Sequence, residues 1–307
     1  MAQVLKEIWT GEMIKAFRTS PESQGWYDRI RSYDQHVDND VIHFTDLGGD
    51  PKVLVNNTTY PLNIKALADA DKPVSLDCYD TEATPVTDNE LHAISYDKMA
   101  SVQERHREAI REKILQKAIH AIAPEQNDKG STPVLTTTGP TSSDGTRRTL
   151  IPADLLAAKA ACDKMKMPAS DRILVLCSDH VNDLLSADQK FREQYNINQS
   201  EGKIGRLYGF DIYEYDATPV YELSSLKKQV LDTGTTEGEV HQSSVFYYNG
   251  RMMKANGSVQ FYYSPAENDP LYHRNLVNFR KWNICLPLKA AQSVGAIVSA
   301  AAEKSDE

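Results

Sequence analysis

The longest helical pattern in the chain lies between residues 96 and 123. Apolar side chains recur there every three or four residues, and most other positions are Arg, Lys or Glu. This spacing predicts a helix over residues 98–122, about 37 Å long and packed on one side only. Ser101 and Glu104 match a capping box, a start one turn earlier is also open, and Pro124 ends the helix. The predicted stripe consists of Val102, His106, Ile110, Ile114, Ala118 and Ile122.

Residues 52–90 have the pattern of a long two-stranded excursion. Residues 52–57 and 60–67 are rich in β-forming side chains, and residues 74–79 alternate on the return. A strand of about 15 residues reaches about 50 Å, whereas a compact globule of this chain length has a radius of gyration of about 19 Å. The hairpin would therefore project beyond its own body. Because isolated ribbons are marginal in water, we expect it to lie on another subunit.

Residues 1–50 predict an arm rather than a core. Residues 4–17 could form a short amphipathic helix, which Pro21 and Gly25 interrupt. Residues 34–46 are polar and irregular. Such a segment would have no core of its own.

The middle of the chain predicts mixed α/β structure. For the polar segment 124–149 two alternatives are open: it contains a short strand at 133–137, or it is ordered only by a partner. Residues 152–167 form a helix with a proline in its first turn, and residues 172–177 form a buried strand. The order helix, strand, helix is typical of an α/β or α+β domain.

Turn signals divide the strand-rich region 203–288. Asn249 followed by Gly250 predicts a type I′ hairpin, and Asn256 followed by Gly257 gives a second turn signal. The glycines at 202, 205 and 209 have the wrong spacing for a dinucleotide loop, so they indicate turns or close backbone approach. Residues 301–307 form a solvated tail.

The composition is that of an ordinary globular protein with an acidic charge. The 307 residues are 40% hydrophobic and 25% charged, which excludes wholesale disorder and coiled coil. With a net charge of -9, the surface as a whole is a poor candidate for binding nucleic-acid phosphates. Residues 290–302 are uncharged and mostly small, and this stretch is too short to span a bilayer. The first residues do not resemble a secretory signal. Four widely spaced cysteines indicate reduced thiols in apolar surroundings: Cys78, Cys162, Cys177 and Cys285.

One segment has catalytic potential. Cys177 ends a predicted strand before a helix capped by Ser178 or Asp179, a position that can depress a thiol pKa, and His180 lies three residues later. A nucleophile and its base usually come from distant segments, so a strand end, a helix cap and a surface histidine are the favoured interpretation. Motifs of phosphate-binding loops, zinc proteases and α/β-hydrolases are absent from the sequence.

Three other groups of residues have some potential for binding. In the pattern from Asp34 to His43, an extended chain would align four polar side chains, Asp34, His36, Asp38 and Asp40, as ligands for a hard cation, although a hydrated arm is the favoured interpretation. The basic pairs Arg147–Arg148 and Lys227–Lys228 indicate solvated surface rather than nucleic-acid contacts. Five aromatic residues could stack bases, but they indicate sheet packing: Tyr247, Tyr248, Phe261, Tyr262 and Tyr263.

Taken in chain order, these segments resemble a tailed-bacteriophage major capsid protein of the Johnson fold, a fold shared with encapsulins. The resemblance rests on the extended loop ending PVSLDCYDTEATPVTDNELHAISYDK before the spine-like helix SVQERHREAIREKILQKAIHAI, and on RRTLIPADLLAAKAACDKMKMP, SDRILVLCSDHVNDLLSADQKFRE and GKIGRLYGFDIYEYDATP. These stretches span roughly residues 74–219, and the flanks fit by order and length.

The resemblance implies an α+β fold with four parts. These are an N-terminal arm (1–51), an extended β-hairpin loop (52–95), a peripheral domain (96–169 and 264–307) containing the spine helix (98–122), and an axial domain (170–263). The arm and the loop would cross to neighbouring subunits, and the axial domain would surround five-fold and six-fold axes.

The implied function is structural and not enzymatic, with no catalytic, cofactor-binding or metal site. Pentamers and hexamers of the chain would self-assemble in the host cytoplasm into the icosahedral or prolate head of a virion. This shell would enclose double-stranded DNA without sequence-specific binding and without a membrane. A separate scaffold protein, a portal, a maturation protease and a decoration protein are candidate partners. The alternatives are an encapsulin-like nanocompartment shell and a soluble α/β enzyme with a Cys177/His180 site.

Two features depart from the family pattern. The arm follows Met1 almost directly, so a scaffold is expected to be either a separate protein or absent. Some relatives form a Lys–Asn isopeptide bond between subunits. Lys65 or Lys72 with Asn275 or Asn278 are candidate positions, but nothing in the sequence identifies a pair, and none is claimed.

Overall fold

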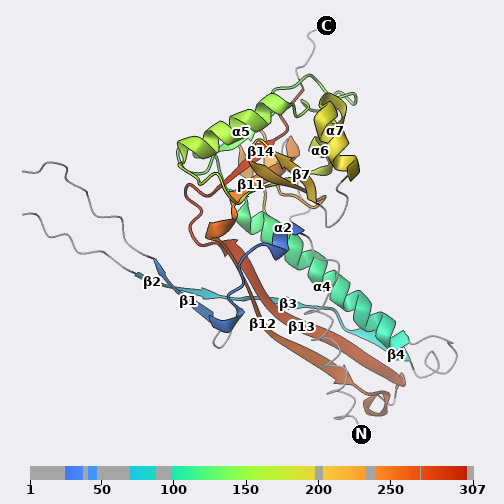
Figure 1. The fold of residues 1–307 in the computed structure, drawn as a ribbon. Coiled ribbons are helices and arrows are strands. Elements are labelled where there is room, and N and C mark those ends of the chain that lie inside the picture. Colours follow the sequence, from blue (N-terminus) through green and yellow to red (C-terminus); the bar gives the residue numbers. More distant parts are fainter. Residues whose placement is uncertain are drawn as a thin grey trace, which may run out of the picture.

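The described part of the chain folds into three sheets arranged along one long helix, α4 (Lys98–Ile122) (Figure 1). The computed structural model describes residues 25–36, 41–46, 70–87, 98–197, 203–231, 239–269 and 271–302. The helix predicted at 4–17 and the strands predicted at 52–57 and 60–67 lie outside these residues. Helices combined with sheets whose strand pairs are mostly antiparallel give the α+β class that the sequence predicted.

An eight-stranded sheet forms the upper part of the molecule in Figure 1. Its strands are β5 (Val134–Thr136), β6 (Arg172–Leu176), β7 (Lys203–Leu207), β8 (Phe210–Glu214), β9 (Val220–Glu222), β10 (Lys227–Lys228), β11 (Val240–Tyr248) and β14 (Val294–Val298). The order is β10-β9-β11-β6-β8-β7, and β14 pairs with both β11 and β5. Strand β6 runs parallel to β8, and β14 runs parallel to β5. The strands predicted at 133–137 and 172–177 are confirmed.

Both faces of this sheet are covered. In β6, Ile173 and Val175 face the C-terminal half of α4, whereas Leu174 and Leu176 face three further helices. A strand buried on both faces needs a continuous apolar run, which explains the sequence RILVL. The three helices are α5 (Pro152–Lys164), α6 (Ser178–Ala187) and α7 (Gln189–Ile197).

Helix α5 ends three residues earlier than predicted. Pro152 occupies its first turn as expected. The backbone turns at Lys166, where φ is +57°, and the Met167 amide donates to the Cys162 carbonyl. A left-handed residue after the last turn closes the helix, which therefore ends before Pro168.

A four-stranded sheet lies beside the N-terminal half of α4. Its strands are β3 (Asp77–Asp80), β4 (Thr84–Thr87), β12 (Met252–Ser264) and β13 (Arg274–Pro287), with β13 in the centre. The predicted helix stripe is confirmed, since each of its six side chains is buried. Helix α4 starts at Lys98, so Ser101 lies inside it and the predicted capping box is wrong. Glu104 instead accepts a 2.6 Å bond from Arg107.

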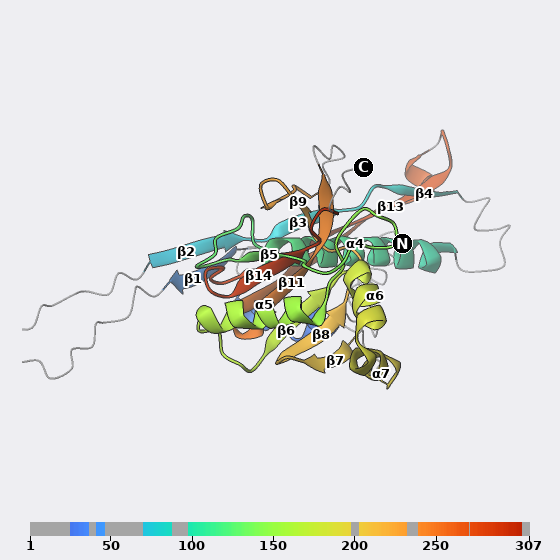
Figure 2. The same cartoon turned by 90° about the horizontal axis from the view of Figure 1, so that it is seen from above.

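A two-stranded ribbon of β1 (Val41–Asp46) and β2 (Ala70–Ser75) projects to one side (Figure 1, Figure 2). The prediction that residues 34–46 are irregular is wrong for β1, whose partner lies about 30 residues further along the chain. At the base of the ribbon, Ile42 is buried against Met253 and Ile284. The boundary predicted between arm and loop at residue 51 therefore falls inside this excursion.

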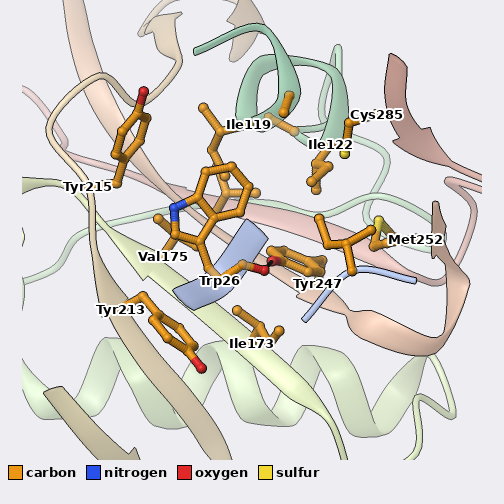
Figure 3. Close-up of a cluster of buried hydrophobic side chains, with 14 of the residues drawn as sticks. Trp26, Ile119, Ile122, Ile173, Val175, Tyr213, Tyr215, Tyr247, Met252 and Cys285 are labelled. Carbon is orange, nitrogen blue, oxygen red and sulfur yellow. Dashed lines mark hydrogen bonds between the residues drawn. The ribbon is translucent and has the colours of Figure 1, made fainter. Parts of the chain in front are cut away.

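Residues 25–36 are anchored in the body, contrary to the prediction of an arm without a core. They contain α2 (Gly25–Asp28) and the 3-10 turn η1 (Asp34–His36). Figure 3 shows Trp26 enclosed by side chains from α4 and the eight-stranded sheet, and it is fully buried. The Tyr33 amide donates to the Lys254 carbonyl at 2.9 Å, which ties this segment to β12.

The turn signals at Asn249 and Asn256 have other roles than predicted. The 3-10 turn η3 (Asn249–Arg251) leads from β11 in one sheet to β12 in another, so the predicted hairpin is wrong. Gly250 fits there because a Cβ would lie 2.7 Å from the Tyr248 ring. Asn256 lies within β12, where the register shifts before Val259, so the second signal marks a bulge.

The sheets do not follow the predicted domain boundaries. Strand β12, assigned to the axial domain, pairs with β13 in the four-stranded sheet. Strands β5 and β14 and helix α5, assigned to the peripheral domain, lie with the eight-stranded sheet. The division into axial and peripheral domains remains a prediction. On the sheet pairing, β12 would belong to the peripheral domain, and β5, β14 and α5 would belong to the axial domain.

Candidate assembly surfaces

The segment around Cys177 is a buried structural element. Cys177 itself is the N-cap of α6, in place of Ser178 or Asp179. Burial raises the pKa of its thiol to about 11, the reverse of the predicted activation. His180 is 0% exposed, so the prediction of a surface histidine is also wrong. The Cys177/His180 site is therefore rejected.

His180 connects helix α6 to strand β11 and to the segment that follows β14. Its Nδ1 lies 2.6 Å from the Ser244 hydroxyl on β11, and its Nε2 lies 2.8 Å from the Ser299 hydroxyl after β14. A hydroxyl can donate or accept, so a neutral imidazole is satisfied on both sides. Burial lowers the pKa of His180 to about 3, which keeps the ring neutral.

The described residues of the candidate cation row do not lie on one extended strand. Residues 34–36 make a 3-10 turn rather than an extended strand, and His43 lies on β1. Asp34 accepts hydrogen bonds from the Asn256 amide and side chain, the shorter at 2.7 Å. Asp38 and Asp40 lie outside the described residues. No group of three or more metal-ligating side chains gathers within the part of the chain that the structure describes.

Two of the predicted surface bases are structural. Arg147 makes a bidentate pair with the largely buried Asp183, at 2.6 and 3.0 Å, and this pairing raises the pKa of Arg147. Lys228 reaches the C-terminal end of α4 rather than solvent, while Lys227 is exposed as predicted. A basic pair in sequence cannot show which of its members is turned inward.

The aromatic residues mostly serve sheet packing, as predicted. The Phe261 ring centroid lies 4.7 Å from that of Phe279, under α4. Tyr247 is fully buried near Trp26, and its hydroxyl donates to the Trp26 carbonyl. Tyr262 is the exposed exception. These rings are not arranged as a base-stacking surface.

The candidate cross-link residues differ in how they are used. The Asn275 Oδ1 accepts bonds from the Tyr263 hydroxyl at 2.7 Å and the Ala266 amide at 3.0 Å, so this amide is engaged within the subunit. Asn278 is half-buried on β13. Lys72 lies on β2, and Lys65 is outside the described residues.

An exposed apolar tip ends the β12–β13 ribbon. Leu271 is 82% exposed and Tyr272 is 63% exposed. The Arg274 guanidinium stacks 4.5 Å above the Tyr272 ring, and its Nε donates to Asp269 at 2.6 Å. The turn thus presents two large apolar side chains in an ordered arrangement, as an interaction surface does.

A second surface is an open groove of about 600 Å³ between α4 and the β3–β4 connection. Ile110 and His106 form part of its floor, and Arg105 and Glu82 stand at its sides. Its walls mix opposite charges.

No helix among the described residues is both long and apolar enough to cross a membrane. Three of the four cysteines are buried as predicted, and Cys78 is exposed.

The arrangement of sheets along a long helix is shared with solved phage structures. The capsid of cyanophage P-SCSP1u matches with a TM-score of 0.63 at 12% identity, covering 90% of this chain and 88% of that chain. A structure from Mycobacterium phage Che8 gives 0.61 at 12% identity, over 90% and 91%. The capsid of Ralstonia phage GP4 gives 0.61 at 10% identity, over 91% and 88%.

No protein-family model and no curated protein matches the sequence. The likeness is therefore one of structure, and at these identities it establishes the fold. It covers about nine-tenths of the chain in each case. The chain has the Johnson fold of tailed-phage capsid proteins.

Proposed function

We propose that this chain is the major capsid protein of a double-stranded-DNA tailed bacteriophage and forms its head shell. The observation that carries the proposal is the match of about nine-tenths of the chain to phage capsid structures. The rejected Cys177 site leaves the enzyme hypothesis without its nucleophile. Assembly, rather than chemistry, is the activity that this fold supports.

Two features of the subunit suit an assembly. The β1–β2 ribbon projects from the body, and a projecting two-stranded ribbon is marginal in water unless it lies on another molecule (Figure 1). Leu271 and Tyr272 expose apolar surface at a second, distant tip. Weak contacts at several such surfaces sum to a stable shell when each subunit engages many neighbours.

The finer features of this proposal come from the family. Copies of the chain would form pentamers and hexamers, with the axial part of the eight-stranded sheet around the symmetry axes. The shell would assemble in the host cytoplasm and enclose DNA without reading its sequence. A separate scaffold, a portal, a maturation protease and a decoration protein are its proposed partners. An encapsulin-like shell is the alternative with the same fold.

The test is light scattering on a sizing column, with negative-stain imaging of each peak, for the protein expressed alone and concentrated with a crowding agent. We expect shells, tubes or five- and six-membered rings. The double variant Leu271→Asp/Tyr272→Ser should stay smaller at an unchanged unfolding midpoint. A wild-type monomer or dimer under all conditions would contradict the proposal. Particles that carry an enzyme rather than DNA in the native host would favour the nanocompartment.

A further inference from the structure

Carbonyl groups at the C-terminal end of α4 accept hydrogen bonds from another element. The carbonyl of His120 would normally accept from the amide four residues later, but that residue is Pro124, which has no N–H. The Lys228 Nζ on β10 donates to the His120 carbonyl at 2.7 Å and to the Ala123 carbonyl at 2.8 Å. A cation at this end also interacts favourably with the helix dipole.

The helix end also donates a hydrogen bond to the residue that follows the β9–β10 ribbon. The His120 Nε2 lies 2.8 Å from the Gln229 carbonyl, which can only accept, so this nitrogen carries the proton. The Lys228 amide donates to the Glu125 carbonyl at 2.8 Å, and the buried Tyr221 hydroxyl donates to the Pro124 carbonyl. Backbone and side-chain bonds thus join the helix end to the ribbon.

Lys228 is charged under ordinary conditions. Burial lowers the pKa of its ammonium to about 8, and the nearby Glu125 acts in the opposite direction. At pH 7 most molecules therefore carry the cation between the two carbonyls. Its sequence neighbour Lys227 is exposed, so the two lysines share a strand and differ in burial.

These bonds differ in kind from the other contacts between α4 and the eight-stranded sheet. Ile119 and Ile122 pack against Val175 and Tyr247 in an apolar cluster (Figure 3). Apolar packing is non-directional, whereas hydrogen bonds fix distance and angle. The N-terminal half of α4 carries the four-stranded sheet through residues such as Ile110. The helix end is therefore one place where the two sheets are oriented relative to each other, and residues 25–36, which pack on the eight-stranded sheet and bond to β12, are another.

We propose that the β9–β10 ribbon locks the angle between the eight-stranded sheet and α4, and thereby sets the curvature of a shell built from this chain. The curvature rests on the proposed capsid function, whereas the lock is a property of the subunit. Lys228 is a positioning residue in this scheme. Its loss should free the helix end without removing the apolar cluster beneath it.

The experiment compares Lys228→Met with the matched control Lys227→Met and the wild type. Hydrogen exchange of the unassembled subunit reports on the lock through the Ala123 amide, which donates to the Ile119 carbonyl at 3.1 Å and is present in all three proteins. We expect exchange at Ala123 to be at least tenfold faster in Lys228→Met, equal to about 1.4 kcal/mol, and unchanged in Lys227→Met. Particle diameters from electron micrographs report on curvature, and we expect Lys228→Met to broaden or shift their distribution.

Each outcome decides part of the proposal. Equal exchange at Ala123 in the two variants would overturn the lock. Faster exchange with an unchanged diameter would confirm the lock and overturn its role in curvature. If the wild type formed no particles, the capsid function would fail, while the exchange data would still decide whether Lys228 holds the helix end.

Discussion

Replacing His180 by glutamine should remove an acid-sensitive part of the folding stability. The histidine is fully buried between α6, β11 and the end of β14, and burial lowers its pKa to about 3. In the unfolded chain an ordinary histidine has a pKa of about 6.5. Between these two values the unfolded state binds a proton that the folded state does not. The stabilising contribution is thus complete above pH 6.5 and is lost as the pH falls toward 3.

The size of the effect follows from the gap between the two pKa values. At pH 5 the pH lies about 1.5 units below the pKa of histidine in the unfolded chain, and His180 stays neutral in the folded protein. Protonation of the unfolded state then lowers the free energy of unfolding by about 2 kcal/mol. At pH 7.5 the ring is neutral in both the folded and the unfolded wild type, and in the folded protein it bonds to the hydroxyls of Ser244 and Ser299. The proton-linked loss of folding stability is therefore small at that pH. A glutamine has no titration in this range and should show no such loss.

The assay is urea unfolding of the unassembled protein at pH 7.5 and pH 5, for the wild type and His180→Gln. Other titrating groups contribute equally to both proteins and cancel in the difference. We expect the wild type to lose about 2 kcal/mol more than the variant over this pH step. An equal loss in both proteins would contradict this account, because His180 would then be free to take up a proton in the folded state. Thiol-dependent turnover that disappears with His180 would restore the enzyme hypothesis.

Two further predictions concern residues that sequence patterns placed outside the core or on the surface. Trp26→Ala should lower the free energy of unfolding by about 3–5 kcal/mol and expose residues 25–36 to proteolysis, because the side chain is fully buried. Trp282→Ala, at a half-buried position, should cost less in the same urea titration. Arg147→Met should destabilise the fold by about 3–5 kcal/mol by leaving Asp183 without its cation. The double variant Arg147→Met/Asp183→Asn removes the unpaired charge and keeps an oxygen to accept from the Leu150 N–H, which donates to Asp183 at 2.9 Å. It should recover most of that loss, and no recovery would show that the charge is not the cause.

Periodicity predicted the elements that repeat one environment along their length. The stripe of α4 is visible in sequence because one side of a long helix faces the sheets and the rest faces solvent. The run from Arg172 to Leu176 is uniformly apolar after its first residue because that strand is covered on both faces. The resemblance to capsid proteins rested on such segments in order, and the shared fold agrees with it.

Single residues with distant partners could not be placed in this way. Trp26 and Ile30 lie four residues apart among polar neighbours, too short a pattern to predict a buried segment, yet both side chains are buried. Strand β1 is short, and nothing near it in sequence indicates a partner at residues 70–75. Asn249 with Gly250 suits a hairpin equally well as a crossing between sheets, because the local turn is similar and only the destination differs.

The spine helix, the buried central strand and the mixed class of the fold could be predicted from sequence alone, since each follows from a repeated pattern of burial. The roles of Cys177, His180 and Lys228 required the folded structure. They depend on groups brought close by folding: the hydroxyls of Ser244 and Ser299 around the ring, and the helix carbonyls before Pro124 at the ammonium. These hydrogen-bond partners come from residues about 60 to 120 positions away in the chain, a separation at which sequence spacing carries no signal.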